Sequence, residues 1–150
     1  MVMPAKISFE ITTPERTIFK DEIDQITLPT EMGEITILPN HIPLVSMLRP
    51  GEMRLIKNGA ESLFAVAGGF IEIQPNNRVI VLADNAERAE EISIERAEAA
   101  RQRAEELMKQ KSVQDVEYTG LAVKIERELA RLRVARKHRG KHSGRVRLDE

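Results

Sequence analysis

The stretch "RVIVLADNAERAEEISIERAEAARQRAEE", residues 78–106, contains the point at which the chain changes from one kind of secondary structure to another. Up to Ala83, apolar and polar residues alternate, which is the period of a β-strand with one buried face. After Ala83 the composition shifts to Ala, Glu and Arg, and residues 85–111 contain neither Gly nor Pro. These residue types favour a solvated helix. The sequence therefore predicts a β domain that is followed by helices.

Short alternating segments recur from Lys6 to Ala83 and are separated by turn sequences. Asn58-Gly59 is the clearest of these turns, since a two-residue type I′ hairpin needs a positive φ at both positions. About eight to ten short antiparallel strands joined by tight turns predict a β-sandwich or flattened barrel over residues 1–85. Gly68-Gly69 has two interpretations here: it is either a bulge or close backbone approach, or an ordinary turn.

Residues 86–137 are predicted to form a hairpin of two helices. The apolar stripe of the first helix is narrow and consists mostly of small side chains: Ala97, Ala100, Ala104, Leu107 and Met108. The second helix is expected from about Glu117 to Lys137, with apolar residues at helical spacing: Leu121, Ile125, Leu129 and Leu132. A short polar connection favours an antiparallel arrangement. Ala contributes far less on burial than the roughly 1.5 to 3 kcal/mol of Leu or Ile, so we expect a weakly held appendage that could detach.

Charge is distributed unevenly along the chain. Residues 131–150 carry eight Lys or Arg and two acidic residues, whereas residues 1–130 carry fifteen and twenty-two. The segment 138–150, with its spaced Gly, Ser and basic residues, is expected to be a disordered basic tail that could contact acidic loops, anionic lipid or RNA.

His138 and His142 could share a helix face as metal ligands, but Gly140 lies between them and no third ligand is evident. We therefore expect no metal site.

Composition argues against several functional classes. The chain has no Cys, its three His lie in no nucleophile or metal motif, and no Gly-rich phosphate loop is present. We therefore expect no catalytic residues and no enzyme. Aromatic residues make up 3% of the chain and Trp is absent, which is unfavourable for binding nucleic acid by base stacking. No signal peptide is evident and no segment approaches the roughly 20 apolar residues of a membrane helix, so any membrane association is expected to come through a partner.

Three stretches carry a resemblance to a known family. They are "GEITILPNHIPLV" (residues 33–45), "VAGGFIEIQPNNRVIVLAD" (66–84) and "ERAEEISIERAEAARQRAEE" (87–106). In this order and spacing, over roughly residues 4–136, the chain resembles the epsilon subunit of bacterial F-type rotary ATP synthases. The resemblance implies a non-catalytic central-stalk subunit of a proton-translocating enzyme. Such a subunit joins the gamma subunit to the membrane rotor ring of c subunits, and it is peripheral to the cytoplasmic face of the bacterial plasma membrane.

The first stretch would form the contact surface with the rotor. By position, Glu34 would face polar or basic groups of the rotor ring, and His41, Pro43 and Leu44 would join the contact with the ring and gamma. Two prolines, at 39 and 43, fix φ and lower the entropy that the loop loses on docking. Asn40 replaces a Gly of the family pattern, and Asn is the other residue that tolerates a left-handed conformation well. The alternative is that Glu34 and His41 are ordinary solvated hairpin residues.

The helical hairpin would be a regulatory element. In the family it permits ATP hydrolysis when folded on the β domain. When extended along gamma it reaches the alpha/beta catalytic head and blocks rotation in the hydrolytic direction. About 45 residues in one continuous helix would span on the order of 65 Å. The alternative for "ERELARLRVARK" (residues 126–137) is a solvated charged face.

Some family members bind ATP in the folded hairpin through an Ile-Asp-x-x-Arg-Ala motif and arginines on both helices. The residues that correspond here, as possible ATP ligands, are Glu87, Ile92, Ser93, Arg96, Ala97, Arg103, Arg127 and Arg131. Ser93 stands where the motif has Asp. It can cap a helix and accept one hydrogen bond, but it lacks the charge-assisted bond of a carboxylate. We therefore expect no required cofactor, and weak or absent binding of ATP as a regulatory ligand.

A second hypothesis is a free-standing β-sandwich binding module whose basic arm contacts nucleic acid. The acidic body, the few aromatic residues and the length of the resemblance all argue against it. Co-purification with gamma and the catalytic head would separate the two hypotheses.

Overall fold

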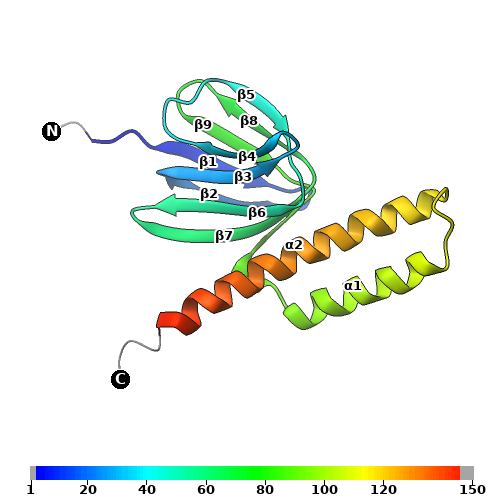
Figure 1. Cartoon of the computed structure of the whole chain (residues 1–150). Coiled ribbons are helices and arrows are strands. Elements are labelled where there is room, and N and C mark those ends of the chain that lie inside the picture. Colours follow the sequence, from blue (N-terminus) through cyan, green and yellow to red (C-terminus); the bar gives the residue numbers. More distant parts are fainter. Residues whose placement is uncertain (1–2, 146–150) are drawn as a thin grey trace.

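The computed structural model describes residues 3–145, which fold into ten strands followed by two helices (Figure 1). The strands are β1 (Ile7–Thr12), β2 (Thr17–Ile23), β3 (Gln25–Thr30), β4 (Gly33–Ile37), β5 (Leu44–Met47), β6 (Gly51–Lys57), β7 (Ala60–Ala67), β8 (Phe70–Gln74), β9 (Arg78–Leu82) and β10 (Asn85–Arg88). A single 3₁₀ turn, η1 (Ala89–Glu91), leads to α1 (Ile94–Lys109) and α2 (Val116–Arg145).

The strands form two five-stranded sheets that face each other. One sheet has the order β2-β1-β9-β8-β5 and the other β10-β7-β6-β3-β4. Neighbouring strands are antiparallel except for β1 and β9, which run parallel. The predicted β-sandwich followed by a helical hairpin is confirmed.

The core lies between the two sheets and is built from alternate residues of each strand. On β1 the buried side chains are Ile7, Phe9 and Ile11. Phe64 from β7 meets them from the opposite sheet, and Phe19 packs between the two rings at centroid distances of 6.0 and 5.8 Å. The apolar residues of the alternating sequence pattern therefore form the inner face of the sandwich.

Two turns confirm specific expectations. Asn58 and Gly59 have φ values of 50° and 77°, as a type I′ hairpin between β6 and β7 requires. Gly68 and Gly69 also have positive φ, and a Cβ on Gly69 would lie 2.0 Å from the carbonyl oxygen of Leu82. The close backbone approach is therefore confirmed for Gly69, and the pair is at the same time the short connection between β7 and β8.

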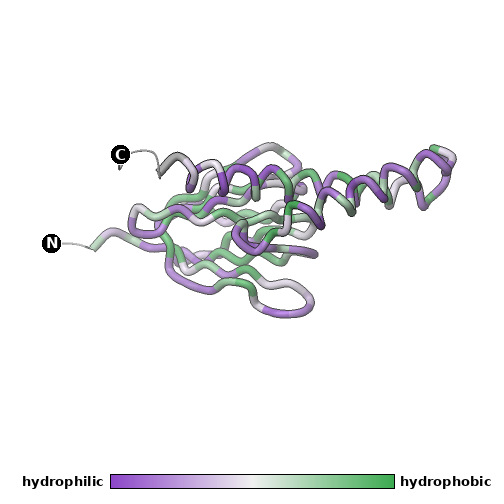
Figure 2. The backbone as a smooth tube through the Cα atoms, turned by 90° about the horizontal axis from the view of Figure 1, so that it is seen from below, coloured by the Kyte–Doolittle hydropathy of each residue, from purple (hydrophilic) through white to green (hydrophobic). Residues whose placement is uncertain are grey.

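The helical hairpin lies on the outer face of the second sheet (Figure 1). The C-terminal half of α2 crosses β7 and β6, while the tip of the hairpin projects beyond the sandwich, as Figure 2 shows from a perpendicular direction. A small second core joins them, made of Leu63, Ala65, Ala89, Ile92, Val134 and Ala135. The attachment of the hairpin is therefore concentrated at the C-terminal half of α2.

Two boundaries differ from the sequence-based expectation. The strands do not stop at Ala83, because residues 85–88 pair with the free edge of β7 as β10. The first helix begins only at Ile94, after Ser93, whose side chain accepts a hydrogen bond from the backbone of Arg96. The β part therefore extends to Arg88, three residues beyond the expected limit at residue 85.

The expected disorder of residues 138–150 is wrong for residues 138–145, which continue α2. Helix continues there because Lys137 and Lys141 reach carboxylates of the sandwich, and these contacts offset the helix-weakening effect of Gly140. The part of that expectation that concerns residues 146–150 lies outside the described residues.

The close approach at Gly69 generates a prediction about stability. Gly69→Ala should destabilise the protein by about 2 kcal/mol or more, because it adds a clash with the Leu82 carbonyl to the strain of a left-handed conformation. Gly59→Ala is the matched control, since Gly59 also has positive φ but open space around its Cβ position. Chemical denaturation would measure both variants, and an equal loss of stability in the two would contradict the role of the close approach.

Candidate functional site

The loop between β4 and β5 has a defined shape that depends on Asn40. Its φ is 67°, so Asn40 adopts the left-handed conformation expected of a residue that replaces Gly. The backbone N–H of Asn40 donates to the side-chain oxygen of Asn77, which fastens the loop to the β8–β9 turn. The ring Nδ1 of His41 lies 2.7 Å from the carbonyl oxygen of Ile42. His41 is half-buried, whereas Pro43 and Leu44 are exposed.

Glu34 lies apart from the rest of the predicted rotor contact. It occupies the β3–β4 turn side of β4, opposite Pro29, whereas His41, Pro43 and Leu44 follow the other end of that strand. Glu34 instead lines a cavity of about 400 Å³ that it shares with Glu126, Leu129 and Arg133 of α2, among others. The structure therefore brings together three of the four predicted contact residues and places Glu34 beside the hairpin.

An exposed apolar row crosses the outer face of the first sheet. Met47, Phe70 and Leu82 are register partners across β5, β8 and β9, so their side chains share a face. Met47 is 52% exposed, and Val45, two residues away on the same strand, is 67% exposed. Beside the row lies a cavity of about 510 Å³ with a mostly apolar lining that includes Met47, Phe70 and Leu82.

Sequence reasoning did not single out this row, although one pattern indicated it. The segment "RVIVLA" (residues 78–83) is apolar at consecutive positions, and a strand with two apolar faces is usually covered on both. In this structure the hairpin covers the other sheet, so the outer face of β5, β8 and β9 remains exposed. We call Val45, Met47, Phe70 and Leu82 the apolar row.

A second candidate site lies where α2 meets β10. A cavity of about 360 Å³ is lined there by Arg16, Asn85, Ala86, Glu87, Glu91, Arg127, Glu128 and Arg131. It contains three of the predicted ATP ligands, namely Glu87, Arg127 and Arg131. We call it the hairpin groove.

Arg131 is already bound by carboxylates within the hairpin groove. Its Nε and Nη2 donate to the two carboxylate oxygens of Glu87 at 2.8 and 3.2 Å, and its Nη1 donates to Glu128 at 2.7 Å. Burial alone would lower the pKa of Arg131, but the hydrogen bonds to Glu87 and Glu128 outweigh it and raise the pKa above its ordinary value. The bidentate pair with Glu87 ties α2 to the last strand of the sandwich.

Glu128 is the residue of this groove that sequence reasoning missed. Its side chain is only 3% exposed, and its carboxylate also lies 3.7 Å from the guanidinium of Arg127. The helical spacing of apolar residues predicted that Leu129 would be buried, yet Leu129 is 41% exposed. The face of α2 that meets the sandwich includes Glu128, Arg131, Val134 and Ala135 instead.

The remaining predicted ATP ligands do not line the groove. Ile92 and Ala97 are buried as packing residues, the former in the small second core and the latter on α1. Ser93 caps α1, and its Oγ accepts from the Arg96 backbone at 3.3 Å. The side chains of Arg96 and Arg103 are exposed and are absent from the lining of the hairpin groove.

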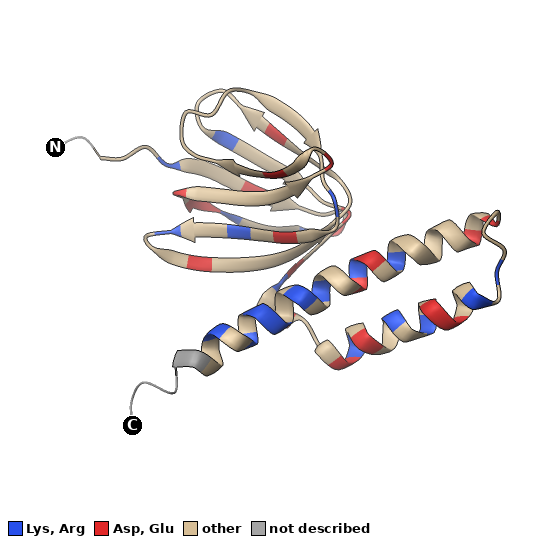
Figure 3. Cartoon of the chain, viewed as in Figure 1, with Lys and Arg blue, Asp and Glu red and all other residues tan. Residues whose placement is uncertain are grey.

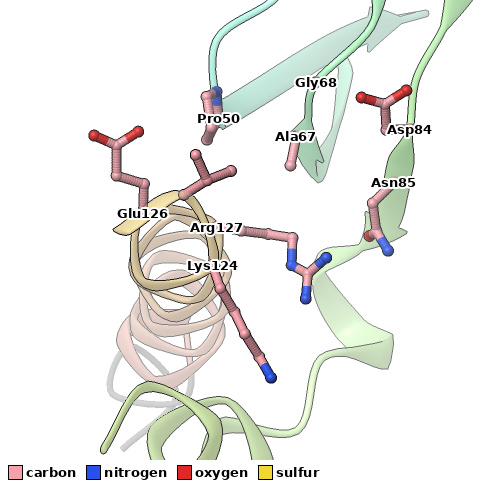
Figure 4. Close-up of a pocket in the computed structure, with 9 residues that line it drawn as sticks. Pro50, Ala67, Gly68, Asp84, Asn85, Lys124, Glu126 and Arg127 are labelled. Carbon is pink, nitrogen blue, oxygen red and sulfur yellow. The ribbon is translucent and has the colours of Figure 1, made fainter. Parts of the chain in front are cut away.

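Arg127 also borders a neighbouring cavity. Figure 4 shows its side chain extending from α2 toward Asn85, in a space of about 280 Å³ also lined by Pro50, Asp84 and Lys124. Arg127 therefore lines two neighbouring cavities beside α2.

Basic residues gather along the C-terminal half of α2, as Figure 3 shows. Lys137 pairs with Glu52 of β6 at 2.6 Å, Lys141 pairs with Glu61 of β7, and Arg136 pairs with Glu98 of α1 at 3.3 Å. The rings of His138 and His142 lie with their centroids 4.3 Å apart and are tilted by 41° to each other. Within residues 3–145, no group of three potential metal ligands is present, and no helix is long and apolar enough to cross a membrane.

Comparison with known proteins identifies the architecture. Residues 6–89 match the model of the ATP synthase Delta/Epsilon chain β-sandwich domain, and residues 90–136 match the long α-helix domain of the same chain. The ATP synthase epsilon chain of Herpetosiphon aurantiacus is 43% identical over 136 residues, which cover 90% of this chain and 98% of that one. The epsilon chain of Chloroflexus aggregans is 47% identical over 134 residues, 89% of this chain and 94% of that one.

Solved structures agree on the fold. A chain in the cryo-EM structure of the Euglena gracilis mitochondrial ATP synthase aligns with a TM-score of 0.73 at 23% identity, over 87% of this chain and 81% of that chain. A β-sandwich that carries a two-helix hairpin is thus the fold of a subunit of rotary ATP synthases. This chain belongs to the family of ATP synthase Delta/Epsilon chains, and its matched relatives are epsilon chains. As such it is a non-catalytic subunit of that membrane-associated complex.

The ion pairs of Lys137 and Lys141 generate a prediction about the hairpin. Truncation after Arg136 removes both lysines, and it should increase opening of the hairpin about two- to fivefold, because exposed ion pairs each contribute roughly 0 to 1 kcal/mol. Amide hydrogen exchange in α1 and α2 would measure the opening. The double variant Glu52→Gln, Glu61→Gln should reproduce the effect in the full chain, and unchanged exchange in both would show that these pairs do not hold the hairpin.

Proposed function

We propose that this chain is the epsilon subunit in the central stalk of a proton-translocating F-type ATP synthase. There it joins the gamma subunit to the membrane rotor ring and regulates ATP hydrolysis through its hairpin. The apolar row is the observation that supports the stalk contact. Large apolar side chains that are aligned and exposed on one face do not stabilise a monomer and are typical of a surface that binds a partner. Membership in the family supports the gamma subunit as the partner of this surface.

We assign the contact with gamma and the contact with the rotor ring to two different surfaces of the β-sandwich. The apolar row lies on a sheet face and extends across β5, β8 and β9, which suits an elongated partner such as gamma. The loop of residues 38–44 lies at one end of the sandwich, is preorganised by two prolines and by the Asn40–Asn77 contact, and exposes Leu38 and Ile42. We assign this end, with His41, Pro43 and Leu44, to the rotor ring. Glu34, which lies beside α2, is assigned to neither contact.

The regulatory part of the proposal is supported by how the hairpin is attached. The tip of the hairpin projects beyond the sandwich (Figure 1), and the residues of α2 that enter the small second core, Val134 and Ala135, lie in its C-terminal half. The small second core takes only four residues from outside the sandwich, Ala89, Ile92, Val134 and Ala135, and two of them are alanines. Such a limited apolar contact is compatible with release of the hairpin toward the alpha/beta catalytic head.

The location follows from the complex. We infer a peripheral position at the cytoplasmic face of a bacterial plasma membrane, reached through the rotor ring. The rival hypothesis of a nucleic-acid-binding arm is not supported, because Arg136, Lys137 and Lys141 are paired with carboxylates of the chain itself.

Docking through the apolar row can be tested with one substitution. Met47→Asp should weaken association with the gamma subunit at least about tenfold, since it replaces an apolar contact by a carboxylate that docking would desolvate. Val116→Asp is the matched control: Val116 is more exposed than Met47 but lies on α2, away from the proposed contact. Binding of purified chains to gamma measures the effect, and equal affinity of Met47→Asp and wild type would refute the assigned surface.

Regulation of ATP hydrolysis by the hairpin is tested separately, with a chain that lacks the hairpin. A chain that ends at Arg88 keeps both proposed docking surfaces but lacks η1, α1 and α2. Assembled into the ATP synthase, it should bind as the full chain does and raise ATP hydrolysis at least about twofold, because the inhibitory element is gone. Hydrolysis equal to that of the complex with the full chain would mean that the hairpin does not inhibit.

A further inference from the structure

Glu128 is an almost fully buried charged side chain that the stalk contact does not use. It lies on the face of α2 that meets the sandwich, together with Arg131, Val134 and Ala135. A buried carboxylate is unfavourable unless opposite charge and hydrogen bonds compensate for its lost hydration. Neighbouring groups must therefore compensate for the buried charge of Glu128.

Two arginines provide that compensation. The Glu128 carboxylate accepts from Nη1 of Arg131 at 2.7 Å, and its other oxygen lies 3.7 Å from Nη2 of Arg127. Glu87, across the groove on β10, receives the other two nitrogens of Arg131. All three guanidinium nitrogens of Arg131 thus already donate to carboxylates of the chain.

The hairpin groove is consequently balanced in charge. Its lining holds three guanidinium groups, from Arg16, Arg127 and Arg131, and three carboxylates, from Glu87, Glu91 and Glu128. Without Glu128, folding α2 onto the sandwich would leave one guanidinium of the groove uncompensated. The closed hairpin would then be as stable as it is with Glu128 only if an anion from solution bound to that guanidinium.

We propose that Glu128 is the internal counter-anion of the hairpin. Its carboxylate neutralises Arg127 and Arg131 in the folded position, so the hairpin closes on the sandwich without a bound nucleotide. A triphosphate that entered the groove would meet the Glu128 carboxylate at the same guanidinium groups, and this like-charge contact opposes its binding. The inference deepens the proposed function, since it rests on the hairpin being the regulatory element and on the groove being its nucleotide position.

The test uses the full chain and removes the charge of Glu128 alone. Glu128→Gln keeps the shape of the side chain and Glu128→Ala removes it, so the pair separates lost charge from lost packing. Glu126→Ala is the matched control, because Glu126 lies two residues away on α2, is exposed, and does not line the hairpin groove. Thermal unfolding of the sandwich in each variant verifies that the β domain remains folded.

Two properties of each variant are measured, its affinity for ATP and the closure of its hairpin. ATP with Mg²⁺ is titrated by calorimetry, and closure is measured as the distance between spin labels on Lys20→Cys of β2 and Gln102→Cys of α1, which is straightforward in a chain without Cys. We expect the wild type and Glu126→Ala to be closed without ATP and to show no saturable binding at about millimolar ATP. Glu128→Gln and Glu128→Ala should open more often, bind ATP at least about tenfold more tightly, and close again when ATP is added.

Two results would overturn the inference: tight ATP binding by the wild type, or Glu128 variants that stay closed and gain no affinity for ATP. Association of the same variants with gamma is measured in parallel, because the apolar row lies on the opposite sheet. If every variant binds gamma but the Glu128 variants behave as wild type, only the inference about Glu128 fails. If the wild type itself does not bind gamma, the proposed function fails.

Discussion

The bidentate ion pair between Arg131 of α2 and Glu87 of β10 joins the helical hairpin to the sandwich, and the register of the hairpin depends on it. With Arg131 held at β10, the next turn of α2 places Val134 and Ala135 on Leu63 and Ala65. The following turns bring Lys137 to β6 and Lys141 to β7. One partly buried, charge-assisted contact therefore sets the position of a helix whose apolar residues are too few to do so alone.

The two sheets of the sandwich have different outer surfaces, and this difference organises the function. The sheet that contains β7 and β6 is covered by α2, so its outer apolar side chains contact the hairpin of the same chain. On the other sheet the apolar row is exposed and is available to a partner. A mobile regulatory element and a fixed docking surface can thus act from opposite faces without competing for the same residues.

Much of the fold could be predicted because it follows from local chemistry. Alternation in segments such as residues 7–11 specifies strands, and Asn58-Gly59 specifies a turn. Prediction failed where one element depends on a distant one. Residues 85–88 form a strand only because β7 has a free edge, and residues 138–145 continue α2 where the helix meets carboxylates of β6 and β7. Of the candidate ATP ligands, Arg127 and Arg131 both line the hairpin groove, and only the fold separates them from Arg96 and Arg103.

The sequence by itself determined the order of strands and helices, the family, and the conformation of Asn40, because each depends on residues close together in the chain. The tertiary structure alone decided which face of α2 is buried. Helical periodicity allows either Leu129 or Glu128 to face inward, and apolar character favours Leu129. Glu128 is buried instead because Arg127, Arg131 and Glu87 form a balanced charge cluster around it, and that cluster exists only once α2 lies against β10.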